Sequence, residues 1–255
     1  MSEKNIEILK QKEKANFWYK QKKSQVIQEI FRKIYGNDYP KELEIDSFVT
    51  MTDLRNIVKY LKIKPGETFL DIGCGKAGPG LWIAREIKAN YVGIDLSEVA
   101  IELATKRIIE FGLKNKVEFY IMNICSTTFP NNYYDGAISI DTLTYVQDKI
   151  KGISEIARIL RSDASFVFTA WETPTTMNDY RPILQENGFE IITYKEILNW
   201  QQRQYEVYKK IIESKDILIS EMGKEGSLPW IEEATERLPL LKDWRRIFGV
   251  ARKKE

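Results

Sequence analysis

The segment Asp71-Ile72-Gly73-Cys74-Gly75-Lys76-Ala77-Gly78 is a glycine-rich turn with a carboxylate placed just before it. The run 67–70 ahead of it is typical of a short buried strand. The run 79–87 behind it is typical of a helix, because proline is tolerated in a first helical turn. A strand, a glycine turn and a helix bring the backbone of an α/β protein close to a nucleotide-like ligand. The segment therefore predicts an α/β fold with a ligand site at this turn.

The charge ahead of the turn discriminates between nucleotide ligands. Gly73, Gly75 and Gly78 match the dinucleotide pattern G-x-G-x-x-G, which is a weak signal when it stands alone. Asp71 would repel a pyrophosphate, but it suits a ligand with an ammonium group at that spot. S-adenosylmethionine is such a ligand, since it joins a nucleoside, a sulfonium and an amino acid without phosphate. We therefore predict S-adenosylmethionine as the cofactor, with Cys74 as a small filler of the turn.

The next two predicted strands end in residues that suit the same ligand. The strand 89–95 ends in Asp95, an acid about twenty residues past the glycines, where it can accept both ribose hydroxyls. Ser97 is then a plausible helix N-cap. The strand 117–122 is followed by Asn123, which can hydrogen-bond the adenine edge. Each residue also has a structural interpretation alone, as a turn or capping residue. Their joint occurrence in this order favours the cofactor site.

The remaining strands complete the pattern. We expect a fourth strand at 134–143, a helix at 150–160, a fifth strand at 165–171, a sixth at 189–194 and a last one at 245–251. In this order of motifs the chain resembles the class I S-adenosylmethionine-dependent methyltransferases. The resemblance implies an α/β, Rossmann-like fold of seven strands with the last strand antiparallel. It also implies an N-terminal helical cap at 1–52, a methyltransferase domain at 53–255 and a helical insertion at 196–241. Leu96, Ile124, Ile140, Tyr19 and Thr50 join the predicted cofactor site.

Four further segments narrow the resemblance. The segments 35–40, 48–55, 78–82 and 238–246 look like a bacterial group of small-molecule methyltransferases often tied to secondary metabolism. This resemblance implies a reaction class, transfer of a methyl group to a small molecule or a peptide natural product. It does not imply one acceptor, because acceptors vary widely among such enzymes.

Composition agrees with a cytoplasmic enzyme. The chain has 255 residues, which suffices for one large core, and its 39 basic and 37 acidic side chains give a net charge of +2. This balance does not mark a nucleic-acid binder. Two cysteines far apart in sequence suggest neither a disulfide framework nor a zinc site, and no metal is predicted. The sequence shows no membrane span and no signal peptide, so we expect a soluble, cytoplasmic protein.

The two additions to the cofactor fold are expected to build the acceptor site. The first carries the aromatic triplet 17–19 and should fold over the cofactor as a lid. The second places Trp200, Tyr208, Ile211, Leu218 and Met222 near one face of one long helix. Their alternative interpretation is simple extension of the core. The predicted acceptor-binding residues are Trp18, Tyr35, Tyr39, Trp171 and Trp200.

The residues at the tips of the fourth and fifth strands bear on the chemistry. Here the box used by enzymes that methylate base amines is absent, and both cysteines precede the position that pyrimidine C5 chemistry needs. Many small-molecule members carry a histidine where this chain has Tyr145, and the chain has no histidine at all. Asp141, Tyr145 and Glu172 are the candidate catalytic residues. The missing base favours a nitrogen acceptor. A hydroxyl or carboxyl oxygen, an RNA acceptor, and a module that binds cofactor without transfer remain alternatives.

Overall fold

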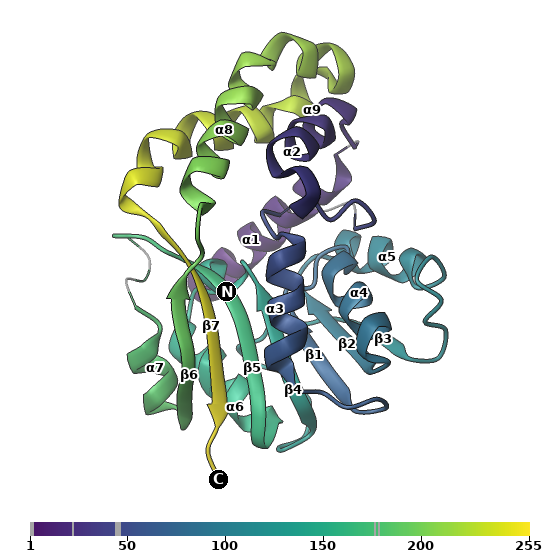
Figure 1. Ribbon diagram of the computed structural model, residues 1–255, viewed down its shortest axis with the longest axis vertical. Helices are drawn as coiled ribbons and strands as arrows, with labels where there is room; N and C mark the ends of the chain where they lie inside the picture. The colour runs from purple at the N-terminus through teal and green to yellow at the C-terminus, as the bar shows by residue number, and fades with distance from the viewer. Residues whose placement is uncertain (1–2, 22, 44–46, 176, 178) are drawn as a thin grey trace.

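A computed structural model of the protein describes residues 3–21, 23–43, 47–175, 177 and 179–255. Its centre is a seven-stranded sheet in the order β3-β2-β1-β4-β5-β7-β6. The strands are β1 (Thr68–Ile72), β2 (Asn90–Asp95), β3 (Val117–Ile121), β4 (Tyr134–Ile140), β5 (Leu160–Glu172), β6 (Phe189–Glu196) and β7 (Arg245–Lys253). β7 pairs antiparallel with both β5 and β6, whereas β1 to β5 pair in parallel. This is the predicted Rossmann-like fold with its last strand antiparallel (Figure 1).

Helices cover both faces of the sheet. One face carries α3 (Met51–Leu61), α4 (Gly78–Ile87) and α5 (Glu98–Arg107), and the other carries α6 (Lys149–Ile159) and α7 (Arg181–Glu186). Because both faces are covered, the central strands β1 and β4 are buried along nearly their whole length. Two separate apolar clusters result, one under α6 and α7 and the other under α3 and α4.

The helix starts follow capping chemistry that the sequence already indicates. The Ser97 hydroxyl accepts a hydrogen bond of 3.1 Å from the Ala100 amide, which confirms it as the N-cap of α5. Thr50 and Asp53 form a reciprocal capping box at the start of α3. In α4 the proline stands in the first turn, where its missing N–H costs no helical hydrogen bond.

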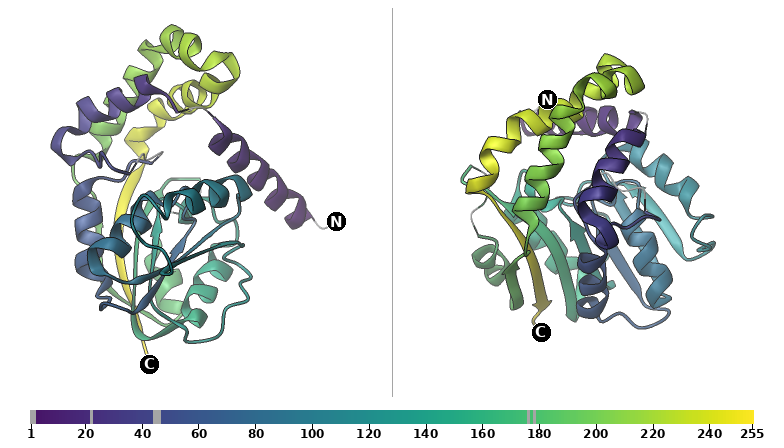
Figure 2. Two further views of the ribbon diagram at one scale, coloured as in Figure 1. Left: turned by 90° about the vertical axis from the view of Figure 1, so that its right-hand side faces the viewer. Right: turned by 45° about the horizontal axis from the view of Figure 1, so that its top comes forward.

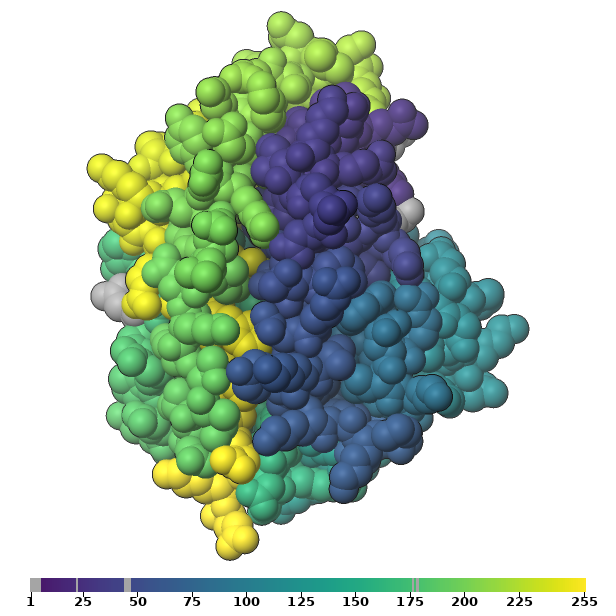
Figure 3. Space-filling view, in the orientation of Figure 1, coloured from purple at the N-terminus to yellow at the C-terminus, as the bar shows by residue number. Residues whose placement is uncertain are grey.

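A helical cap stands on the carboxyl ends of the strands. It is built by α1 (Glu3–Lys20), α2 (Gln25–Tyr35), η1 (Gly36–Asp38), α8 (Trp200–Glu213), α9 (Lys215–Arg237) and η3 (Leu238–Asp243). Figure 3 shows the N-terminal segment and the insertion side by side in this cap, where α2 packs against α8. A third apolar cluster joins the two segments, and Ile27, Phe31, Val207 and Ile211 lie buried in it. The cap therefore has a core of its own.

One expectation about the insertion is wrong. The sequence pattern predicted one long helix through Trp200 and Met222, but α8 ends at Glu213 and α9 begins at Lys215. α9 is kinked in addition at Gly223, which has φ of 75° and ψ of 167°. The spacing of the apolar residues resembles that of one helix because two successive helices turn them toward the same apolar cluster. These residues are Trp200, Tyr208 and Ile211 of α8 and Leu218 of α9.

α1 differs from the other cap helices. It runs away from α2 across the end of the α/β domain toward α5 (Figure 2). None of its described side chains between Ile6 and Lys20 is fully buried, and its apolar side chains are spread around the helix. A helix of this kind is held by contacts at several points rather than by one apolar face.

Candidate active site

The glycine turn is fixed to the neighbouring strand. The amides of Gly73 and Cys74 both donate to the Ile94 carbonyl, at 2.8 and 3.0 Å. Gly73 has φ of 70°, and a Cβ there would lie 2.2 Å from the Thr142 side chain. A Cβ at Gly75 would lie 2.5 Å from the Tyr19 hydroxyl. Glycine is therefore required at both positions, by backbone conformation and by the close approach of two other segments.

Asp71 is a buried carboxyl at the end of β1. Its side chain accepts a hydrogen bond of 2.9 Å from the Tyr91 hydroxyl. Burial raises the pKa of Asp71 to about 7, a rise that the Tyr91 hydrogen bond opposes and the charge of Asp95 adds to. No basic side chain in the described part of the chain forms an ion pair with Asp71. The site thus holds a buried carboxyl that a ligand cation would satisfy.

Asp95 and Asn123 end the next two strands. The two carboxylate oxygens of Asp95 accept from the amides of Gly75, at 2.9 Å, and Ser97, at 2.8 Å. Burial raises the pKa of Asp95, and these backbone hydrogen bonds oppose the rise. Each oxygen retains a second lone pair for a ligand. The Asn123 side-chain oxygen accepts from the Cys125 amide at 2.9 Å, which fixes the side chain at the end of β3.

These strand ends open into one cavity of about 710 Å³, a volume typical of small-molecule sites. Among the predicted residues, it is lined by Asp71, Gly73, Cys74, Gly75, Gly78, Asp95, Leu96, Asn123, Ile124, Ile140, Tyr19, Trp18, Asp141, Tyr145 and Trp171. The structure therefore brings the predicted cofactor residues of four strands together in one cavity. The aromatic side chains of Trp18, Tyr19 and Trp171 line the same cavity.

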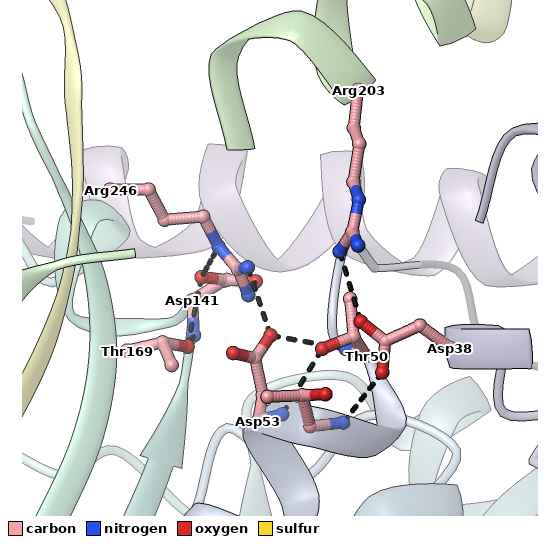
Figure 4. Close-up of polar contacts among 8 residues, drawn as sticks. Asp38, Thr50, Asp53, Asp141, Thr169, Arg203 and Arg246 are labelled. Carbon is pink, nitrogen blue, oxygen red and sulfur yellow. Dashed lines mark hydrogen bonds and ion pairs between the residues drawn. The ribbon is translucent and has the colours of Figure 1, made fainter. Parts of the chain in front are cut away.

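Asp141 lies at the tip of β4 with a left-handed φ of 56°. Its carboxylate accepts two hydrogen bonds from Arg246, at 2.9 and 3.1 Å, and one from the Thr169 hydroxyl at 2.9 Å. Arg246 is 2% exposed and also pairs with Asp53 of α3 at 3.1 Å (Figure 4). The charge of Asp141 is thus neutralised inside the protein. Its role in this arrangement is to hold the loop after β4 against β7 and α3.

The same close-up shows a second ion pair nearer the cap. Arg203 of α8 donates to Asp38 at 3.0 Å, and Asp38 accepts from the Thr52 amide at 2.8 Å (Figure 4). The insertion is therefore tied through η1 to the start of α3. This ion pair therefore ties the cap to the α/β domain.

Tyr145 lies in η2 (Leu143–Tyr145), directly after β4. Both terminal nitrogens of Arg237 donate to its hydroxyl at 3.2 Å. Removal from water raises the pKa of the Tyr145 hydroxyl, and the positive charge of Arg237 opposes this rise. Near neutral pH the hydroxyl is therefore protonated.

Several predicted residues do not line the cavity. Glu172 is buried, accepts from the Tyr194 hydroxyl and pairs with Arg245 at 3.0 Å. Thr50 caps α3, and Trp200 packs edge-on against Trp171 with ring centroids 5.0 Å apart. Tyr35 and Tyr39 are buried in the apolar cluster of the cap. These side chains support the cavity walls from behind.

Other lining residues were missed by the sequence analysis. They include Gln11, Phe48, the α9 residues Trp230, Glu232, Glu233, Glu236 and Arg237, and the basic residues Lys14, Lys76, Arg107 and Lys151. The spacing 233–236–237 does indicate one helix face, but a second helix in the insertion was not predicted. Trp18 of α1 meets Trp230 with ring centroids 4.7 Å apart, so the seam between lid and insertion forms part of the cavity wall.

Comparison with known proteins agrees with this geometry. Residues 70–168 match a family described as a methyltransferase domain. Residues 70–168 therefore carry a methyltransferase domain, and the fold around them is that of the class I S-adenosylmethionine-dependent methyltransferases. Phosphoethanolamine N-methyltransferase 3 of Arabidopsis thaliana is 30% identical to it over 139 residues, which are 54% of this chain and 28% of that protein.

Solved structures share the fold of this chain at low sequence identity. The crystal structure of the (4+2) cyclase SpnF has a TM-score of 0.70 at 20% identity, covering 90% of this chain and 93% of that one. Phosphoethanolamine N-methyltransferase 2 of Haemonchus contortus, in complex with phosphomonomethylethanolamine and S-adenosylhomocysteine, has a TM-score of 0.71 at 19% identity. That match covers 89% of this chain and 56% of the other.

The chain spans between 19% and 52% of the length of eight curated relatives that it matches. Among its described residues, no helix is both long and apolar enough to cross a membrane.

Proposed function

We propose that this protein transfers a methyl group from S-adenosylmethionine to the nitrogen of a small-molecule amine. One observation carries the proposal. A single cavity joins the ends of β1, β2, β3 and β4 to aromatic and carboxylate side chains of the cap. A cofactor and an acceptor can thus lie in one space, which is the requirement for direct transfer.

The strand-end half of the cavity fits the cofactor. Asp71 offers a buried carboxyl to the ammonium group, and Asp95 offers free lone pairs to the ribose hydroxyls. Asn123 and Ile124 line the same cavity and are available to the adenine. When bound, S-adenosylmethionine supplies a methyl group already activated on sulfonium. The protein then contributes mainly alignment, which is worth up to ~7–11 kcal/mol in favourable intramolecular cases.

The cap half of the cavity fits a cationic amine. Trp18, Phe48, Trp171 and Trp230 line it with aromatic rings, which attract cations through their faces. α9 adds the carboxylates of Glu232, Glu233 and Glu236, and among the ion pairs of the described residues only Glu233 has a partner, Arg237 at 3.2 Å. Such carboxylates attract an ammonium ion and can take the proton it loses before its nitrogen attacks.

A hydroxyl acceptor is less well served by these residues. It must lose a proton as it attacks, and the chain has no histidine. Tyr145 stands in the position where relatives often carry one, but desolvation of its hydroxyl by the surrounding protein raises its pKa, so it holds its proton near neutral pH. A neutral amine needs no such base. These observations support nitrogen over oxygen.

The test uses tritiated S-adenosylmethionine and a small-molecule extract separated by charge. We expect label in the cationic small-molecule fraction. Label in the neutral or acidic fraction would favour an oxygen acceptor. Label in added RNA with strong salt dependence would favour the nucleic-acid alternative. S-adenosylhomocysteine binding without labelling of any fraction would indicate chemistry other than transfer.

A further inference from the structure

The Tyr145 hydroxyl has its accepting side occupied by Arg237. Both terminal nitrogens of the guanidinium donate to the phenolic oxygen at 3.2 Å. A phenol has one hydrogen of its own to donate. With a cation filling the lone-pair side, that hydrogen must point away from Arg237. Tyr145 lines the cavity and is 49% exposed, so the direction left open leads into the cavity.

Arg237 is itself fixed by contacts from the insertion. It donates to Glu233 at 3.2 Å, and the same carboxylate oxygen accepts from the Tyr208 hydroxyl at 2.9 Å. Tyr208 is 3% exposed in the apolar core of the cap. The guanidinium also lies 5.8 Å from the Trp244 ring centroid and 6.0 Å from that of Tyr145. A continuous series of contacts therefore runs from the cap core to the phenol.

The backbone of Tyr145 is held by a different element. The Gln11 side chain of α1 donates to the Tyr145 carbonyl at 2.7 Å. The Tyr145 amide donates to the Thr142 carbonyl at 2.9 Å. Both additions to the cofactor fold thus meet at this one residue, α1 at its backbone and α9 at its hydroxyl.

We infer that Arg237 is a positioning residue, which holds the Tyr145 hydroxyl so that it donates a hydrogen bond to the acceptor bound in the cavity. Because an amine nitrogen has one lone pair, which attacks the methyl group, the hydrogen bond goes to a different polar atom of the same acceptor molecule. That an acceptor receives this hydrogen bond rests on the proposed function. The contact between Arg237 and Tyr145 is independent of it. The insertion thus supplies, through Arg237 of α9, a side chain that orients a group of the transfer site, in addition to enclosing the cavity.

The charged groups around the Tyr145 hydroxyl determine in which direction its pKa should shift when Arg237 is replaced. Arg237 lowers the pKa of Tyr145, while Glu233 from α9 and Asp141 from the preceding loop raise it, as does removal from water. Loss of the Arg237 charge should therefore raise this pKa further. A lysine at 237 would keep the charge but lose the two-nitrogen geometry.

The first measurement replaces Tyr145 with difluorotyrosine, whose more acidic phenol titrates in an accessible range. Ultraviolet absorbance of the phenolate is followed in the full chain loaded with S-adenosylhomocysteine. We expect Arg237→Gln to raise the pKa at position 145 by about 1–3 pH units, and Arg237→Lys to raise it less. Arg203→Gln is the matched control, since it removes another ion-paired arginine of the cap, and it should leave this pKa unchanged. An equal pKa in Arg237→Gln and the parent protein would overturn the pairing.

The second measurement asks whether Arg237 acts through Tyr145. Transfer of tritium to the small-molecule extract is compared in Arg237→Gln, Tyr145→Phe and the double variant. We expect Tyr145→Phe to slow transfer about 2–10-fold, the worth of one neutral hydrogen bond. Adding Arg237→Gln to Tyr145→Phe should then change the rate by less than about twofold. Independent, multiplying effects would overturn the positioning role.

Folding of the variants is checked by S-adenosylhomocysteine binding, which should stay within about threefold of the parent. If Arg237→Gln fails this check, Arg237→Lys takes its place in both measurements. If no variant or parent transfers methyl to any fraction, the proposed function fails. The titration at position 145 still decides the pairing in that case.

Discussion

The buried carboxyl of Asp71 gives ligand binding a pH dependence at the scale of a single residue. Its pKa is raised to about 7, and the predicted partner is an ammonium group that binds the ionised form. We expect the affinity for S-adenosylhomocysteine to fall by up to about tenfold per pH unit below pH 7, because binding then releases a proton. Calorimetry between pH 5.5 and 8 measures this. Asp71→Asn should bind more weakly and show a flat profile, and an equally flat profile in the parent would remove Asp71 from the site.

The same carboxyl should cost the ligand-free protein stability. A folded-state pKa above the unfolded value of about 3.9 favours folding below pH 4, and that contribution is lost as pH rises through 7. We therefore expect ligand-free Asp71→Asn to be more stable than the parent above pH 7, by up to ~4 kcal/mol, and similar to it near pH 4. Urea unfolding at both pH values tests this expectation. A destabilised variant at pH 8 would mean that Asp71 has a cation partner in the folded chain.

Asp95 should contribute through hydrogen bonds to the ribose. Removing a charged acceptor costs roughly 1.5–3 kcal/mol per hydrogen bond, so Asp95→Ala should weaken S-adenosylhomocysteine binding by about that amount. Glu102→Ala is a control on the same side of the fold, because Glu102 is exposed and pairs only with Lys106 at 2.6 Å among the described contacts. Unchanged affinity in Asp95→Ala, or tight binding of NAD by the parent, would show that the cofactor assignment is wrong.

At the scale of elements, α1 has the properties of a lid. None of its side chains described from Ile6 onward is buried, and its polar contacts to other elements include those of Gln11, Lys12 and Asn16, the last two to Glu98 of α5 and to the N-cap Ser97. Tyr19 lies over the glycine turn. Removing residues 1–20 should leave the unfolding temperature nearly unchanged and slow transfer at least about tenfold, since the site is then open to water. Full turnover by the shortened chain would show that α1 is dispensable.

The shortened chain must keep α2. Ile27, Ile30, Phe31 and Tyr35 are buried against α8 and its neighbours, and each buried apolar side chain contributes about 1.5–3 kcal/mol. A deletion through residue 40 would therefore expose the cap core. It would confuse loss of the lid with loss of the fold.

The elements themselves were largely predictable. Each strand of the sheet shows in the sequence as a short apolar run, and those that end in Asp71, Asp95 and Asn123 were located by their polar tips. Periodicity could not separate α8 from α9, because the break at Ser214 falls between apolar residues that face one cluster. The strand β5 begins at Leu160, five residues before its predicted start, since its early residues Arg161 to Asp163 are polar and exposed.

At the scale of the whole molecule, the residues of the proposed cofactor half could be read from the sequence, whereas the α9 residues of the proposed acceptor half could not. Asp71, Gly75 and Asp95 lie within 25 positions of one another, and the order of parallel strands brings them together. Arg237 and Tyr145 are 92 positions apart, and they meet only because the insertion folds back over the strand ends. A contact between residues so far apart leaves no pattern in the local sequence around either residue. For Glu172 the position was predictable but the direction of the side chain was not. It lies at the end of β5, yet its carboxylate contacts Tyr194 and Arg245 and does not line the cavity.

The molecule as a whole brings the proposed cofactor site and the proposed acceptor site into a single cavity. The most direct measurement is the position of the methyl group in the product. The full chain is incubated with trideuteriomethyl-labelled S-adenosylmethionine and the small-molecule extract, and the labelled product is analysed by mass spectrometry and NMR. The account predicts a trideuteriomethyl group on nitrogen, formed at a rate that rises with pH through the pKa of the acceptor amine. A methyl ether or ester as the main product, or a methyl group on carbon, would contradict it.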